Sequence, residues 1–174
     1  MIIERVWEEL HNVKGYILQI EEYTDNRRKL NRGVAYLTIC CALVSAITAF
    51  FPDCKWGTFA ASVIVFVCTL LKEWAPNIFQ PEEELKELDE IHDFYTKYFQ
   101  ALEKLFMERY DSNSKVDDTT MTSRFDKIKK TEKDNATRLN RLCRNLSKKE
   151  AKKIEKRVVE YFDRTYKGKY DEEK

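Results

Sequence analysis

Two uncharged apolar runs lie close together in the first half of the chain and restrict its fold more than any other feature. Residues 33–51 form a run of 19 residues and residues 56–71 a run of 16, and neither run contains a charged side chain. As helices they would be roughly 28 Å and 24 Å long, against a bilayer core of about 30 Å. Only four residues, among them Pro52 and Asp53, separate them. The pattern predicts a transmembrane hairpin with spans at 33–51 and 56–74.

The alternative for these runs is a buried hairpin inside a soluble core. Charged residues make up 35% of the chain, so the remaining sequence offers little apolar surface to cover two such helices. Arg27, Arg28, Lys29 and Arg32 precede the first run, whereas the turn between the runs carries one Lys and one Asp. By the positive-inside rule, we expect a multi-pass membrane protein with both termini in the cytoplasm.

The chain as a whole favours long helices, because it has only 4 Gly and 3 Pro in 174 residues. The expected fold class is therefore all-α, a two-helix transmembrane hairpin with a cytoplasmic helical bundle. Residues 1–32 are predicted to be a cytoplasmic amphipathic helix, because apolar residues recur at spacings of three and four. The apolar seam consists of Ile3, Val6, Leu10, Val13, Ile17 and Ile20.

Four further segments follow from the sequence. Residues 33–74 are the hairpin, and residues 75–110 are predicted to contain a long cytoplasmic helix that begins near Pro81. Residues 111–121 are polar and are predicted to be a linker. Residues 122–174 are predicted to be a basic helical region with one helix at about 122–146 and a second after Ser147, which has capping-box spacing to Glu150.

Charge is segregated along the cytoplasmic part. Residues 81–111 contain ten acids and four bases, whereas residues 123–157 contain fourteen bases and five acids. One interpretation is that the acidic helix and the basic segment pair inside the bundle. The excess of bases also suggests that some positive surface stays free for anionic lipid, for a nucleotide or nucleic acid, or for solvent.

A stripe of small, mostly polar side chains runs along one face of the first span, at Thr38, Cys41, Ser45 and Thr48. Small residues allow membrane helices to approach closely, so the stripe is explained by helix packing alone. The functional interpretation is that these four residues line a pore, which requires an oligomer because two spans cannot enclose a water path. Neither apolar run, 33–51 or 56–71, contains an ionisable Asp, Glu, His, Lys or Arg, which argues against a proton-coupled transporter.

The basic region supplies a candidate site for a phosphate-bearing ligand. Clustered guanidinium and ammonium groups can hold phosphate oxygens through charge-assisted hydrogen bonds. The candidate residues are Arg138, Arg141, Arg144, Lys148, Lys149, Lys152 and Lys153. The alternative for this surface is a solvated helix face.

No catalytic or metal-binding pattern is present. The chain has no glycine-rich phosphate loop and no Cys or His ligand spacing, so we expect neither an enzyme nor a resident metal or cofactor.

The arrangement resembles the SLATT family, small two-span effectors associated with nucleotide-signalling antiphage systems in bacteria. The resemblance covers about residues 3–110 and rests on the architecture and on RRKLNRGVAYLTICCALVSAITAFF, followed by PDCKWG and a second span. It implies a protein of the bacterial inner membrane that responds to a nucleotide signal. Some relatives work beside a nucleotidyltransferase, which is then expected to be encoded nearby.

These observations predict a homo-oligomeric pore, a tetramer, gated by a nucleotide or oligonucleotide messenger in antiphage defence. The alternative is a membrane-anchored adaptor whose cytoplasmic bundle recruits a partner protein.

Overall fold

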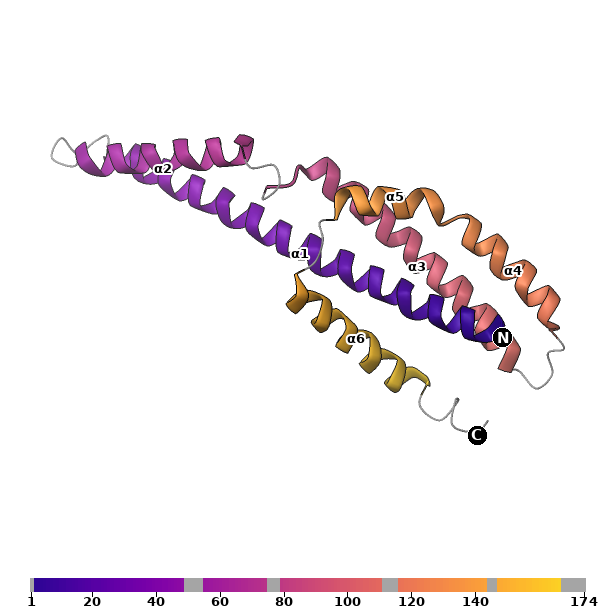
Figure 1. Ribbon diagram of the computed structural model, residues 1–174. Helices are drawn as coiled ribbons and strands as arrows, with labels where there is room; N and C mark the ends of the chain where they lie inside the picture. The colour runs from indigo at the N-terminus through magenta and orange to yellow at the C-terminus, as the bar shows by residue number, and fades with distance from the viewer. Residues whose placement is uncertain (1, 49–54, 75–78, 111–115, 144–146, 167–174) are drawn as a thin grey trace. The chain divides into compact units, whose positions relative to one another are not determined.

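The computed structural model describes residues 2–48, 55–74, 79–110, 116–143 and 147–166. Within these ranges the chain forms helices and no strands (Figure 1), which confirms the all-α prediction. The helices are α1 (Ile2–Thr48), α2 (Lys55–Trp74), α3 (Glu82–Tyr110), α4 (Asp118–Lys130), α5 (Lys133–Leu142) and α6 (Lys148–Tyr166).

The first helix is longer than either segment predicted for its part of the sequence. The amphipathic segment 1–32 and the apolar run that follows join in α1, a single helix of 47 residues. The chain divides into two compact units, residues 1–22 with 86–174 and residues 23–85, and α1 contributes to both.

Residues 23–85 form an antiparallel pair of helices. Near one end the Thr48 and Thr58 hydroxyl oxygens are 2.6 Å apart, and toward the other the Asn31 amide nitrogen donates to the carbonyl oxygen of Gln80 at 3.0 Å. In Figure 1, α2 lies beside the C-terminal part of α1. The buried residues along this pair are small, and they include Cys41 and Ala61. Small side chains allow the two backbones to approach closely.

The unit made of residues 1–22 and 86–174 is a helical bundle around the N-terminal part of α1. In Figure 1, α6 lies on one side of α1 and α3, and α4 and α5 lie on the other. The predicted seam of residues 1–32 is buried in this core apart from Ile3, which is half-buried. The indole of Trp7 contacts aromatic rings from two other helices, with ring centroids 5.1 Å from Phe106 and 5.0 Å from Phe162.

One expected helix is divided in the structure. The segment predicted as a single helix at about 122–146 contains α4, which already begins at Asp118, and α5, which ends at Leu142. Helix α4 begins before the predicted start at residue 122 because the carboxylate of Asp117 accepts a hydrogen bond from the Thr120 backbone amide. It ends where the Thr131 hydroxyl and amide both donate to the carbonyl of Ile128, which closes the last turn.

The capping box predicted at the start of α6 is confirmed. The Glu150 carboxylate accepts hydrogen bonds from the Ser147 amide at 2.9 Å and hydroxyl at 2.6 Å, and the Glu150 amide donates back to the Ser147 hydroxyl. These bonds fix where α6 starts, because they satisfy amide groups that have no partner inside the helix.

Candidate functional site

The most unusual surface of the molecule is the apolar face of the α1–α2 pair. Apart from Tyr16 and Val159, every exposed large hydrophobic side chain in the described ranges lies between Leu30 and Val67. By length and composition α1 can cross a membrane, and only 6% of its most apolar 18-residue stretch is buried. In α2, Trp56–Leu70 is a shorter apolar stretch. The core helix of a soluble protein buries its apolar residues, whereas this pair exposes them.

The predicted pore stripe faces α2 in the single chain. Cys41 is buried, Ser45 and Thr38 are half-buried, and Thr48 shares a hydrogen bond with Thr58. The hydroxyl groups of Thr38 and Thr48 also donate to the carbonyls of Val34 and Val44, each at 2.8 Å. The structure therefore brings the stripe together on one face, and in the protomer that face packs against the neighbouring helix.

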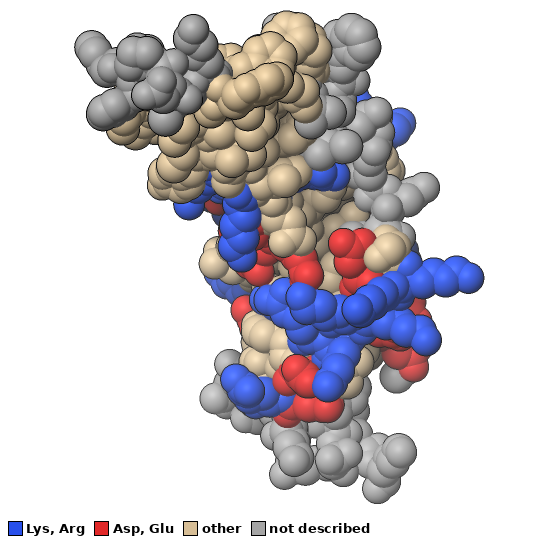
Figure 2. Space-filling model, turned by 90° about the vertical axis from the view of Figure 1, so that its left-hand side faces the viewer, with Lys and Arg blue, Asp and Glu red and all other residues tan. Residues whose placement is uncertain are grey.

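Two of the predicted phosphate-binding arginines are held by the acidic helix α3. The Arg138 and Arg141 guanidinium groups contact the Glu87 carboxylate at 2.8 Å and 2.7 Å, and Arg138 also reaches Glu90 at 3.3 Å. The hydrogen bond from Arg138 holds the pKa of Glu87 below its ordinary value, and Arg141 adds to this effect. The pairing of acidic and basic segments is thus present in the bundle, and Figure 2 shows blue and red side chains interleaved on one face.

The lysines of α6 divide into paired and exposed side chains. Lys153 contacts Glu22 at 2.6 Å, and Arg157 lies 3.6 Å from the same carboxylate. Lys148, Lys149 and Lys152 are exposed. Arg144 lies outside the described residues. Of the seven predicted ligand-binding residues, the structure therefore leaves three lysines on the outer face of α6.

A polar cluster that the sequence analysis missed connects α1, α3 and α4 with the turn that follows α4. Glu9 is only 8% exposed, and its two carboxylate oxygens accept from the Tyr98 hydroxyl at 3.0 Å and the Lys129 ammonium at 2.8 Å. Glu132, between α4 and α5, is the second carboxyl of the cluster. Burial and the nearby charge of Glu9 raise the pKa of Glu132. The sequence feature that could have indicated a buried carboxylate was the position of Glu9, three residues after Val6 on the apolar side of α1.

We expect Glu132→Gln to stabilise the bundle at neutral pH. A raised folded-state pKa means that the ionised form of Glu132 opposes folding, so its cost appears as pH rises from the ordinary glutamate value through the raised one. The melting temperature of the variant should exceed that of the natural chain at pH 7–8, and the difference should vanish as the pH falls to about 4.5. Thermal unfolding followed by circular dichroism across this range measures the effect.

Glu155→Gln, on the exposed face of α6, is the matched control and should change the melting temperature little at any pH. A difference between Glu132→Gln and the natural chain that does not vary with pH would contradict this account of the cluster.

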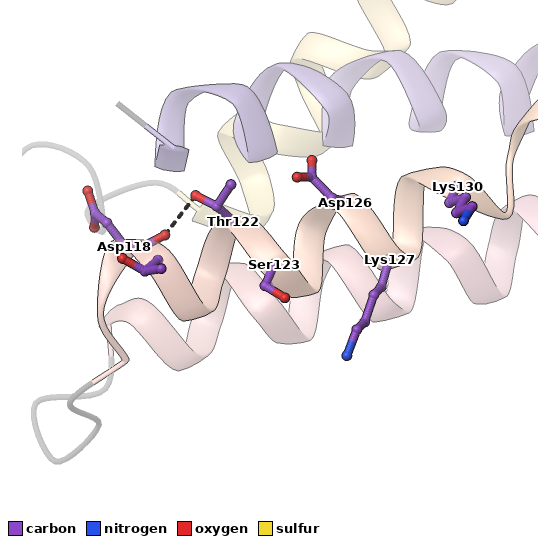
Figure 3. A pocket seen from close by; sticks show the side chains of 7 residues that line it. Asp118, Thr122, Ser123, Asp126, Lys127 and Lys130 are labelled. Atoms are coloured by element: carbon purple, nitrogen blue, oxygen red, sulfur yellow. Dashed lines mark hydrogen bonds between the residues drawn. The ribbon is translucent and has the colours of Figure 1, made fainter.

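A hollow on the surface of α4 offers little for chemistry. It has a volume of about 660 Å³, and all of its lining residues belong to α4. Figure 3 shows that these side chains, among them Thr122 and Lys127, point in different directions from a single helix. Within the described ranges, no group of three or more His, Cys, Asp or Glu side chains is placed to hold a metal ion.

Comparisons of the chain with protein-family models, with curated proteins and with solved structures found no match.

Proposed function

We propose that the protein is a membrane-embedded effector whose α1–α2 hairpin enters the bilayer. The observation that supports this most strongly is the exposed apolar surface of the hairpin, because such a surface is unfavourable in water and favourable in lipid. The length of α2, 20 residues or about 30 Å at 1.5 Å per residue, matches a bilayer core.

The ends of the hairpin carry side chains suited to the membrane interface. Tyr36 is 68% exposed near the start of the apolar run, and Trp56 is 83% exposed at the start of α2. Tyr and Trp concentrate at both interfaces of a bilayer, and Lys and Arg flank its cytoplasmic side. These features and the cluster at Arg27–Arg32 support a multi-pass protein with both termini in the cytoplasm, and the SLATT resemblance supports the bacterial inner membrane as its location.

In this proposal several copies, four in the simplest arrangement, assemble into a pore. The arrangement with Thr38, Ser45 and Thr48 packed on α2 is the closed state. Opening exchanges contacts between α1 and α2 for contacts between copies, which turns the hydroxyl groups toward a water path. A pore lined by hydroxyl groups selects ions weakly, because it presents no fixed charge.

The cytoplasmic bundle supplies the sensor. An anionic ligand, a nucleotide or oligonucleotide by the resemblance, contacts Lys148, Lys149 and Lys152 and competes with Glu22 for Lys153. Loss of the contact to Glu22 releases α6 from α1, and α1 carries the change into the span because it is one continuous helix. The ligand works as a switch only if it binds the open arrangement more tightly than the closed one.

The test is ion flux through the full chain in liposomes, with a cyclic dinucleotide or a short oligoadenylate as the probe. We expect flux that needs the probe, and its complete loss on combined replacement of Thr38, Ser45 and Thr48 by Leu. Lys149→Glu with Lys152→Glu should remove the response to the probe and leave assembly unchanged. Size-exclusion chromatography in detergent checks assembly.

Matched controls separate pore lining from general damage. Ile39→Leu, Val44→Leu and Ile47→Leu together change the exposed apolar face of the same helix and should preserve flux. Lys130→Glu, exposed on α4, should preserve the response to the probe. Unchanged currents in the Thr38, Ser45 and Thr48 variant would exclude those residues from the pore.

The second candidate is a membrane-anchored adaptor, in which the hairpin only tethers the bundle. The packing of the hydroxyl stripe against α2 favours it, because that packing gives the stripe a structural role within one protomer. The absence of flux with every probe, in protein that inserts and folds, would favour the adaptor over the pore.

A further inference from the structure

A groove of about 420 Å³ lies between α1 and α6, and the exposed Lys148, Lys149 and Lys152 are not among the residues given as its lining. Its α1 wall contains Gly15 and Tyr16, and its α6 wall contains Ile154, Val158 and Val159. A volume of this size is typical of sites for small molecules. Unlike the larger hollow on α4, the groove has walls from two helices that are far apart in sequence.

The glycine in this groove has no evident structural purpose. Gly15 lies inside the long helix α1, where a glycine is less stable than an alanine by about 1 kcal/mol. A Cβ atom at Gly15 would meet nothing within 4 Å, so close packing does not require glycine there. The effect of glycine at this position is to keep the groove open.

The polar groups of the groove surround an apolar wall. Asn12 and Gln19 contribute amides, which both donate and accept hydrogen bonds, and Glu155 contributes a carboxylate. The Nδ1 nitrogen of His11 lies 2.9 Å from the carbonyl oxygen of Trp7, and a carbonyl oxygen only accepts. Nδ1 therefore donates to that carbonyl, and the imidazole ring stacks on Phe162 with ring centroids 3.8 Å apart.

These groups define the chemistry of the occupant. The lining residues include one carboxylate and neither Lys nor Arg, so the groove does not suit a phosphate. The aliphatic wall and the half-exposed ring of Tyr16 suit a flat, apolar ring face. The carboxylate of Glu155 and the two amides suit a ring whose edge carries N–H donors.

We infer that this groove binds an uncharged, flat nitrogen heterocycle with amino or imino donors, the chemical class of the purine bases. The inference uses neither the pore nor the α6 lysines, because a neutral nucleoside carries no phosphate for the lysines to bind.

Titration calorimetry with adenosine and guanosine on the full chain in lipid nanodiscs tests the inference. We expect saturable binding of at least one nucleoside and a loss of affinity of about tenfold or more in Gly15→Leu, which fills the groove. Gly33→Leu is the matched control, because Gly33 also has nothing within 4 Å of its Cβ position and lies outside the groove.

Asn12→Ala, at an exposed position, is a second variant that should weaken binding without disturbing the fold. Failure of both nucleosides to bind at millimolar concentration, or undiminished binding by Gly15→Leu, would overturn the assignment. Neither result would affect the flux test, whose probes carry phosphate.

Discussion

Replacement of Leu43 and Phe66 by Arg should prevent the chain from entering the membrane. Both side chains lie on the exposed apolar surface of the hairpin, at 58% and 63% exposure. An arginine at the centre of a membrane helix costs about 3 kcal/mol on insertion scales, so the two together oppose insertion strongly. Membrane fractions washed with alkaline carbonate should retain the natural chain and lose most of the double variant.

Val159→Arg is the control for this experiment, because Val159 is 49% exposed on α6, outside the hairpin. That variant should stay in the membrane fraction. The membrane assignment fails if the natural chain stays dispersed in buffer without detergent, or if the double variant resists the wash equally well.

The second large effect is expected at the buried polar cluster. Lys129→Met removes the ammonium group 2.8 Å from the Glu9 carboxylate and leaves that charge buried near Glu132. An uncompensated buried carboxylate costs about 2 kcal/mol or more, which corresponds to a fall in melting temperature of about 4–8 °C for a chain of this size. Thermal unfolding of the purified chain in detergent measures it.

A second substitution that restores stability to Lys129→Met distinguishes the effect of the unpaired charge from the effect of lost packing. Glu9→Gln in the Lys129→Met background removes the unpaired charge and keeps an acceptor for the Tyr98 hydroxyl, so much of the lost stability should return. Lys127→Met changes an exposed lysine on the same helix and should have little effect. If the double variant is no more stable than Lys129→Met alone, the cluster does not stabilise the bundle through charge.

The periodic apolar patterns predicted the helices of the bundle well. The seam of residues 1–32 is buried apart from Ile3, because a helix in a bundle buries the residues that recur every three to four positions. On α6 the spacing predicts an apolar face at Ala151, Ile154, Val158 and Phe162, of which Ala151 is exposed and the others are buried. His92, which lies between Leu88 and Tyr95 on the apolar face of α3, also departs from the pattern. Its side chain is 29% exposed and lies 3.4 Å from Glu21.

The candidate ligand site was less predictable. Spacing identified the basic residues of 138–153, yet which of them are paired depends on carboxylates remote in sequence. Glu87 is 51 residues from Arg138, and Glu22 is 131 residues from Lys153. Periodicity within one helix gives no information on such contacts.

The sequence by itself determined that the chain is helical, where its apolar surface lies and how its charge is divided, because these properties follow from residue type and local spacing. Only the tertiary structure decided which face of the C-terminal part of α1 packs on α2, which cations are paired and that Glu9 is buried beside Lys129. Each of these depends on which helix faces another, and packing between distant segments sets that choice.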